Sequence, residues 1–329
     1  MTDREHRLEA PHRRLDPGSP VVERAVVVGY RAFAWVISHL PPAIPRVILA
    51  RGAQLSYILW PTKRRWSNAN FGHVLGLSPG HPKVRMTALA AYGVYGRYVV
   101  ELARLPQLAR EHADELVGGM DLDAIHKIWS ESKGGLIFTL GHLGNAEAAA
   151  AGVASRGWPI NVVADDSSFP GLFEEFRRTR EQWGVHVIPW RNLREIYTVL
   201  RRREMLALLI DWGYREDGIP VKLFDAWTTM PAGPATLAAK TGSRILPITI
   251  RRNADHRTFS ITWTDPIEVA SSDPASLQRA TQAMADAFAA SVGPAPSQWY
   301  SFKPLWPAAV AESEALAARA AEMLSGGPA

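Results

Sequence analysis

Short apolar runs, separated mostly by helical segments, dominate the sequence from residue 135 to residue 263. A continuous apolar run is typical of a strand buried on both faces, and helices between such strands indicate a parallel sheet. We therefore predict an α/β fold with a largely parallel mixed sheet flanked by helices. The expected strands are Gly135–Leu140, Ile160–Ala164, Val185–Pro189, Met205–Asp211, Arg244–Arg251 and Arg257–Trp263, and the expected helices are Ala146–Ser155, Gly171–Trp183, Leu193–Arg203 and Ala232–Thr241.

The sequence before this alternating region has helical spacing. Val21–Leu40 is the most apolar helix candidate, and Pro41 and Pro42 end it. Further helices are expected near Pro45–Leu59 and over Pro82–Leu105. We divide the chain into a disordered leader (1–20), a helical membrane-associating region (21–110), an α/β domain (111–306) and a C-terminal helix and tail (307–329).

The first two helix candidates, together with the residues that follow the second, combine apolar surface with basic and aromatic residues. These residues are Arg24, Arg31, Trp35, Tyr57, Trp60, Lys63, Arg64, Arg65 and Trp66. Such a surface suits the interface of an anionic leaflet, although packing of the helices on the sheet would also explain it. No run of 18 uncharged apolar residues occurs, so no membrane-spanning helix is predicted. We expect a peripheral protein on the cytoplasmic face of the plasma membrane, with the anionic membrane surface as a partner.

Composition excludes several classes of function. The 329 residues include no cysteine, which excludes disulfides, thiol nucleophiles and iron–sulfur clusters. The formal net charge of +5 is small for this length and no nucleic-acid-binding motif accompanies it, so no nucleic-acid partner is expected. The G-x-S-x-G, P-loop and G-x-G-x-x-G motifs are absent. We predict no metal site and no cofactor.

His142 follows the first predicted strand. In an open α/β sheet, ligands bind beyond the carboxyl ends of the strands, and this histidine lies there between Gly141 and Gly144. Glu147 comes five positions later; on a continuous helix the two side chains would lie on different faces. A pair therefore requires the turn that the glycines permit. His142 is a candidate acid–base residue, although a lone loop histidine often only caps a turn.

The segment LGHLGNAE around His142 fits an H-X4-E motif. It resembles the lysophospholipid acyltransferase superfamily, in the branch of lipid A late acyltransferases and phosphatidylinositol mannoside acyltransferases. Further segments resemble other blocks of this family in the same order: Arg65–Leu77, Phe173–Pro189, Leu209–Pro234 and Lys240–Arg252. The resemblance extends over about residues 20–305. Trp212 and Gly213 stand where family members usually carry Arg or Gln beside an Asp.

This resemblance implies a membrane-associated O-acyltransferase. The fatty acyl donor would be an acyl thioester, either acyl-CoA or acyl carrier protein, and the acceptor a hydroxyl of a membrane glycolipid of the phosphatidylinositol mannoside type. The alternatives are a lysophospholipid or lipid A-like acceptor, or a non-catalytic lipid-binding relative. Acyl transfer to a hydroxyl requires a base for its proton and donors for the oxyanion, and a neutral imidazole suits the first task.

The resemblance also assigns roles to individual residues. It makes His142 the general base, and Glu147 and Glu216 are the two acids that could orient its imidazole. We expect Glu216 to orient His142 and Arg180 to hold Glu147, although ordinary surface positions would explain Arg180 and Glu216 equally well. The residues expected to bind substrate are Arg180, Gly144, Asn145, Asp211, Arg215 and Pro231.

Overall fold

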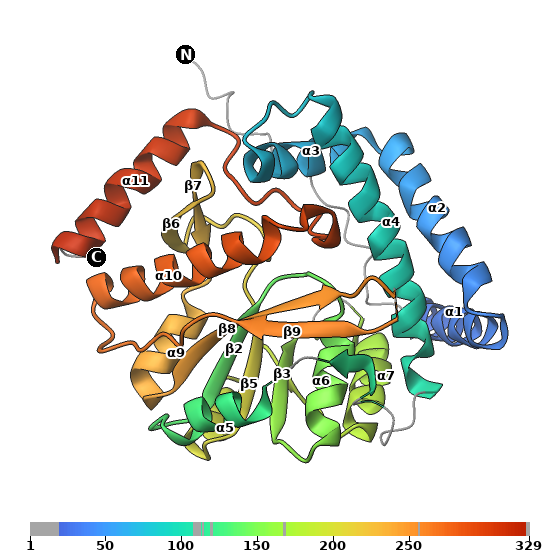
Figure 1. Ribbon diagram of the computed structural model, residues 1–329, viewed down its shortest axis with the longest axis horizontal. Helices are drawn as coiled ribbons and strands as arrows, with labels where there is room; N and C mark the ends of the chain where they lie inside the picture. Colours follow the sequence, from blue (N-terminus) through green and yellow to red (C-terminus); the bar gives the residue numbers. More distant parts are fainter. Residues whose placement is uncertain are drawn as a thin grey trace.

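Seven strands form the central sheet, in the order β1-β9-β8-β2-β5-β3-β4 (Figure 1). The computed structural model describes residues 20–107, 113, 115–118, 121–166, 169–255 and 257–326. The strands are β1 (Val117–Gly118), β2 (Leu136–Leu140), β3 (Ile160–Ala164), β4 (His186–Pro189), β5 (Met205–Leu209), β8 (Arg244–Arg252) and β9 (Phe259–Trp263). Neighbouring strands run parallel except β8 and β9, which are antiparallel. The predicted largely parallel mixed sheet is confirmed.

Helices make up much of the rest of the described chain. They are α1 (Pro20–His39), α2 (Ala43–Leu59), α3 (Pro61–Leu75), α4 (Pro82–Arg104), α5 (Leu122–Ser130), α6 (Ala146–Ser155), α7 (Pro170–Gln182), α8 (Leu193–Arg201), α9 (Gly233–Thr241), α10 (Pro274–Val292) and α11 (Val310–Ser325). The hairpin of β6 (Ile219–Leu223) and β7 (Ala226–Met230) lies outside the main sheet. Helix α10 was not predicted, although Asp273 as its cap and Pro274 in its first turn are typical of a helix start.

Alternate side chains of β2 enter different cores, as the pleat of a strand requires. Ile137 belongs to a core that includes residues of α8, α9 and α10. Leu136 and Phe138 belong to a core that includes residues of α5 and α6. Helices therefore cover both faces of the sheet, and this explains why its central strands are continuous apolar runs.

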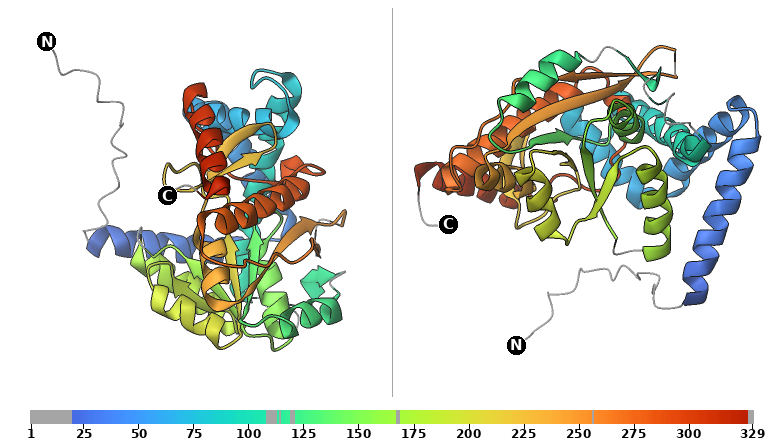
Figure 2. Two further views of the ribbon diagram at one scale, coloured as in Figure 1. Left: turned by 90° about the vertical axis from the view of Figure 1, so that its left-hand side faces the viewer. Right: turned by 90° about the horizontal axis from the view of Figure 1, so that it is seen from below.

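The N-terminal helices form a layer at one side of the sheet. Helices α2 and α4 lie side by side (Figure 1), and a Cβ at Gly96 would lie 2.3 Å from the carbonyl oxygen of Leu49, so their backbones are in direct contact. Helix α1 lies at the flank of the molecule against α7 (Figure 2), where Arg31 pairs with Glu175 at 2.6 Å. Two elements distant in sequence are thus joined at this flank.

The predicted N-terminal helices agree with the structure to within a few residues. Helix α1 ends at His39, before Pro41 and Pro42. Apart from Pro20, the leader predicted for residues 1–20 lies outside the described residues. Within the described ranges, no helix combines the length and the apolar character needed to cross a membrane.

Candidate active site

His142 and Asp211 meet because of the register between two neighbouring strands. Strands β2 and β5 are parallel with Leu140 opposite Leu209, and the N–H of Ile210 donates to the carbonyl oxygen of Leu140 at 3.0 Å. Each of the two side chains follows two residues later, beyond the carboxyl end of its strand. The register thus joins residues 69 positions apart at the edge of the sheet where ligands bind.

Asp211 is a buried carboxylate that accepts three hydrogen bonds. Its Oδ1 accepts from Nδ1 of His142 at 2.7 Å, and its Oδ2 accepts from the backbone N–H of His142 at 2.9 Å and from Nε1 of Trp299 at 2.8 Å. The side chain of Asp211 is 0% exposed, whereas that of His142 is 31% exposed. Because a carboxylate only accepts hydrogen bonds, Nδ1 carries the proton of the neutral ring. Nε2 then carries the lone pair, and it has no hydrogen-bond partner among the described residues.

The charges of His142 and Asp211 stabilise each other. Burial lowers the pKa of His142, but the negative charge of Asp211 and the hydrogen bond to it outweigh burial, so this pKa lies above its ordinary value. Burial raises the pKa of Asp211, but the charge of His142 and the hydrogen bonds from His142 and Trp299 bring it below its ordinary value. Lys303 opposes the effect of Asp211 and lowers the pKa of His142. Asp211 is therefore ionised at neutral pH, and His142 gains a proton more readily than an ordinary histidine.

Glu147 forms an ion pair that joins α6 to α7. Nε and Nη2 of Arg180 donate to its two carboxylate oxygens at 2.8 and 2.5 Å, and the side chains of Arg180 and Glu147 are 16% and 15% exposed. Burial lowers the pKa of Arg180, but the charge of Glu147 and the hydrogen bonds to it raise this pKa above its ordinary value. The contact expected between Arg180 and Glu147 is present, so Glu147 is held by Arg180 and not by His142.

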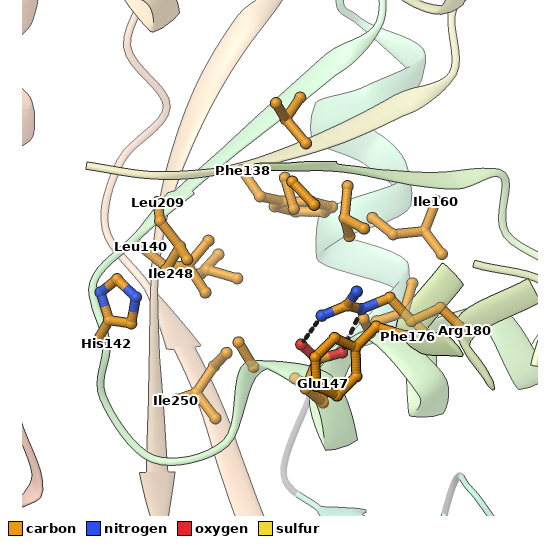
Figure 3. Close-up of a pocket in the computed structure, with 18 of the residues that line it drawn as sticks. Phe138, Leu140, His142, Glu147, Ile160, Phe176, Arg180, Leu209, Ile248 and Ile250 are labelled. Atoms are coloured by element: carbon orange, nitrogen blue, oxygen red, sulfur yellow. Dashed lines mark hydrogen bonds and ion pairs between the residues drawn. The ribbon is translucent and has the colours of Figure 1, made fainter. Parts of the chain in front are cut away.

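One apolar cavity of about 380 Å³ brings these groups together (Figure 3). It lies between one face of the sheet and helices α6 and α7. Its apolar wall includes Phe138, Leu140, Ile160, Val162, Phe173, Phe176, Leu209, Ile248 and Ile250. Figure 3 shows His142 at one side of these apolar side chains and the Glu147–Arg180 pair at the other. In the part of the chain that the structure describes, no three His, Asp or Glu side chains are grouped in a way that could hold a metal ion.

Glu216 does not contact His142, contrary to the expectation from the motif. Its side chain is exposed in the connection between β5 and β6, and its carbonyl oxygen accepts a hydrogen bond from Arg319 of α11 at 2.8 Å. Asp211 lies five residues earlier, directly at the end of the strand, and occupies the position beside the imidazole. The prediction that Glu216 is the partner of His142 is therefore wrong, and the partner is Asp211. Asp211 was predicted to bind substrate, but in the structure it holds the histidine.

Gly144 and Asn145 lie outside the cavity wall. Gly144 has φ of +66°, and a Cβ there would lie 2.3 Å from the carbonyl oxygen of Ile250, so this turn requires glycine. Asn145 caps α6 by accepting from the N–H of Ala148 at 3.0 Å and donates to Oε2 of Glu101 at 2.9 Å. Both residues hold the turn after His142 in place, and neither is among the described residues that line the cavity.

Arg215 and Pro231 are also outside the cavity wall, as far as the structure describes it. Arg215 is exposed and pairs with Asp217 at 2.8 Å, and Pro231 directly follows β7. Of the residues predicted to bind substrate, Arg180 is the one that the described wall contains. The substrate-binding roles of Arg180, Gly144, Asn145, Arg215 and Pro231 all remain predictions.

Trp299 and Tyr300 complete the site, and the motifs did not indicate them. Trp299 is 0% exposed and donates to Asp211, while the backbone N–H of Tyr300 donates to the carbonyl oxygen of His142 at 3.0 Å. The ring of Tyr300 stacks on Tyr98 with centroids 5.0 Å apart. The one signal in the sequence is that a buried tryptophan needs an acceptor for its N–H, and this does not identify the acceptor.

Comparison with known proteins identifies the family of this chain. Residues 17–307 match the sequence model of the bacterial lipid A biosynthesis acyltransferases, so the chain belongs to this family and is an O-acyltransferase. The phosphatidylinositol mannoside acyltransferase of Mycobacterium tuberculosis (strain H37Rv) is 29% identical over 310 residues, which cover 91% of this chain and 94% of the relative. The enzyme of the same name from Mycolicibacterium smegmatis is 26% identical over 300 residues, which cover 89% and 94%. The family resemblance seen in the motifs is confirmed.

Proposed function

We propose that this acyltransferase moves a fatty acyl group from an acyl thioester to a hydroxyl of a membrane glycolipid of the phosphatidylinositol mannoside type. One observation carries the proposal: His142, whose Nδ1 is held by a buried carboxylate, lies in the wall of an apolar cavity with its Nε2 unengaged. The names of the two mycobacterial relatives support the acceptor class. The proposed donor is acyl-CoA or acyl carrier protein, and the protein would need no cofactor of its own.

In this proposal His142 acts first as a base and then as an acid. Nε2 takes the proton of the acceptor hydroxyl while the hydroxyl oxygen attacks the carbonyl carbon of the thioester. A C–O bond forms, and the carbonyl oxygen carries the negative charge of the tetrahedral intermediate. The intermediate then collapses, the C–S bond breaks, and the imidazolium gives its proton to the leaving thiolate. Asp211 holds the ring in the required tautomer and stabilises the imidazolium between the two steps.

The apolar cavity is the proposed site of the acyl chain. Its volume of about 380 Å³ lies within the range of small-molecule sites, and each methylene buried there contributes ~0.8 kcal/mol. The Glu147–Arg180 pair holds α6 and α7 together at one side of this space. We assign the pair to positioning of the acyl site and the His142–Asp211 pair to proton transfer.

Exposed apolar faces of α1 and α2 support attachment to a membrane surface. Helix α2 exposes Ile44, Val47, Ile48, Leu55, Ile58 and Leu59, and helix α1 exposes Val21, Val22, Val28, Trp35 and Val36. The spacing of the α2 residues places them along one face of the helix. A helix of this kind lies in the plane of the interface with its apolar face inserted. On the cytoplasmic face, a soluble acyl donor and a lipid acceptor would meet at this surface.

Part of the basic cluster that follows α2 is engaged in contacts within the protein. Arg64 donates to the carbonyl oxygen of Ile58 at 2.6 Å, and Nζ of Lys63 lies over the ring of Trp66, 4.6 Å from its centroid. Burial lowers the pKa of Lys63, and Tyr57 is buried. The apolar face of α2 therefore replaces the basic cluster as the main attachment surface that we propose.

Cosedimentation with vesicles of phosphatidylcholine and phosphatidylinositol tests this surface. We expect the double substitution Ile48→Asp and Leu55→Asp to reduce binding strongly, because it puts two charges on the inserted face. Neutralising Lys63, Arg64 and Arg65 serves as the comparison and should have the smaller effect. If neutralising the basic cluster reduces vesicle binding more than the double substitution does, electrostatic attraction is the main cause of attachment.

Acyl transfer itself is tested with purified protein, palmitoyl-CoA or palmitoyl acyl carrier protein, and a panel of acceptors. The panel contains a phosphatidylinositol mannoside, a lysophospholipid and a lipid A precursor. We expect transfer to the mannoside, and a loss of ~10²–10⁴ in turnover for His142→Ala. The matched control is His186→Ala, because His186 also contacts a carboxylate, that of Glu195 at 2.7 Å, but is exposed on β4.

Each contrary result of this experiment has a defined meaning. Transfer by His142→Ala at the wild-type rate would overturn the assignment of the base. Transfer to the lysophospholipid alone, or to the lipid A precursor alone, would establish that compound as the acceptor. Of these two alternatives, the name of the family favours the lipid A precursor. Binding of acceptor without transfer from either donor would indicate a non-catalytic lipid-binding protein.

A further inference from the structure

A second cavity, of about 510 Å³, lies between α2, α4 and the end of β8. Figure 1 shows α2 and α4 side by side. The two cavities share no lining residue in the described part of the chain. The second is lined by four arginines from three elements: Arg46 and Arg51 of α2, Arg97 of α4 and Arg252 of β8. Because the cavity is separate from the acyl site, its lining needs an explanation of its own.

The charges in this cavity are not balanced by the protein. No Asp or Glu is among the described residues that line it. Arg252 pairs with Glu101, which lies outside the lining, at 2.6 Å, whereas Arg46, Arg51 and Arg97 form no ion pair with a described carboxylate. Three positive charges thus remain in excess around one space. Such an excess of positive charge suits an anion.

The guanidinium of Arg46 adds a second, independent observation. Its Nε is buried and has no hydrogen-bond partner among the described residues. A buried donor without a partner costs free energy, and the side chain that carries it belongs to a residue of the cavity lining. The side chain of Ser297 and the amides of Gln54 and Gln298 add neutral polar groups to the same lining.

We infer that this cavity binds a phosphate ester. A guanidinium presents planar paired donors that match phosphate oxygens, and several convergent arginines suit a group with more than one negative charge. The backbone contact at Gly96 keeps α2 against α4, so the two arginine-bearing helices are held before the ligand arrives. The phosphate belongs either to a phospholipid headgroup or to a soluble nucleotide such as coenzyme A. Val47, which is 60% exposed on the apolar face of α2, also lines the cavity and places it beside the proposed membrane surface.

Calorimetric titration of the full-length protein with two probes tests the inference and separates the sources. One probe is dihexanoyl phosphatidylinositol below its critical micelle concentration, and the other is coenzyme A. We expect the double substitution Arg46→Gln and Arg97→Gln to weaken binding of one probe at least about tenfold, because two charged hydrogen-bond donors are lost. Loss for the lipid alone identifies a headgroup site, and loss for coenzyme A alone identifies a nucleotide site.

The control carries the same change of charge at another place. Arg201→Gln with Arg202→Gln alters two exposed arginines at the end of α8 and should leave both affinities unchanged. Arg46→Lys with Arg97→Lys keeps both charges but removes the paired donors of the guanidinium groups. We expect its affinity to lie between those of the wild type and of the Arg46→Gln, Arg97→Gln variant. Equal affinities in the Arg46/Arg97 variant and the control, at equal melting temperature, would overturn the inference, as would no binding of either probe by the wild type. The titration involves no acyl transfer, so its result does not depend on the proposed function.

Discussion

The site contains two acid–base pairs that differ in burial, in chemistry and in how the chain assembles them. Asp211 is fully buried at the end of a strand and holds an imidazole, which changes protonation near neutral pH. Glu147 lies in the first turn of α6, is 15% exposed, and holds a guanidinium, which stays protonated. Glu147, which is nearer to His142 in sequence, thus pairs with Arg180, whereas Asp211, which is distant in sequence, contacts the histidine.

The largest difference between the pairs is expected in turnover. Asp211→Asn keeps the size of the side chain but removes the charge and lets Nδ1 accept instead of donate, so kcat should fall about 10⁴-fold. The melting temperature should change little in comparison. Steady-state kinetics and thermal unfolding of the same preparation measure both quantities. Turnover near the wild-type value would show that Asp211 does not orient the base.

The next largest effect is expected in the stability of the protein when the Glu147–Arg180 pair is broken. Glu147→Gln leaves the charge of Arg180 uncompensated in a mostly buried position, and should reduce the free energy of unfolding by about 3–5 kcal/mol. Denaturant unfolding of the variant measures this loss. The double substitution Glu147→Gln with Arg180→Met removes the orphaned charge and should recover part of the stability. If Glu147→Gln abolishes turnover without loss of stability, Glu147 acts in the chemistry and its proposed positioning role is wrong.

The pH dependence sharpens the account of the His142–Asp211 pair, because the imidazole of His142 titrates near neutrality. The pKa of His142 is raised above its ordinary value of 6.5, and only the neutral ring can act as a base. The rising limb of kcat/KM should therefore lie above pH 6.5. The stabilisation from the imidazolium–Asp211 pair is fully present below the unfolded pKa and is lost as pH rises through the raised folded pKa. The melting temperature of wild type relative to His142→Gln should fall over that interval.

The smallest effect is expected at Glu216. Its side chain is exposed and its contact to Arg319 uses the backbone carbonyl, so Glu216→Gln should change stability by no more than about 0.5 kcal/mol and leave kcat unchanged. Parallel assays with Asp211→Asn provide the reference. A strong loss of turnover in Glu216→Gln would restore the role that the family resemblance suggested for it.

Much of the central fold could be predicted because its causes are local. Apolar runs and helical spacing identified strands β2 to β5, β8 and β9 and helices α6 to α9, and the glycine-bracketed position of His142 identified the edge of the sheet. The Glu147–Arg180 contact followed from the family blocks. In each of these the signal lies within one segment of sequence.

The partner of His142 could not be predicted in this way, because it depends on strand order. Asp211 reaches the histidine only because β5 pairs with β2 at a register that puts Leu209 opposite Leu140. A shift by one residue would turn its side chain to the other face. Trp299 is a further case, since nothing near it in sequence shows that its N–H reaches Asp211.

The hydrogen bond from Trp299 to Asp211 also sets the order in which the protein becomes competent during synthesis. The chain is synthesised from its N-terminus at about 5–20 residues per second, so Trp299 follows Asp211 by about 4–18 s. In that interval Asp211 and His142 are already made, but Asp211 lacks one of its three donors. A chain that ends before Trp299 therefore contains the acid and the histidine but not the complete set of hydrogen bonds around Asp211.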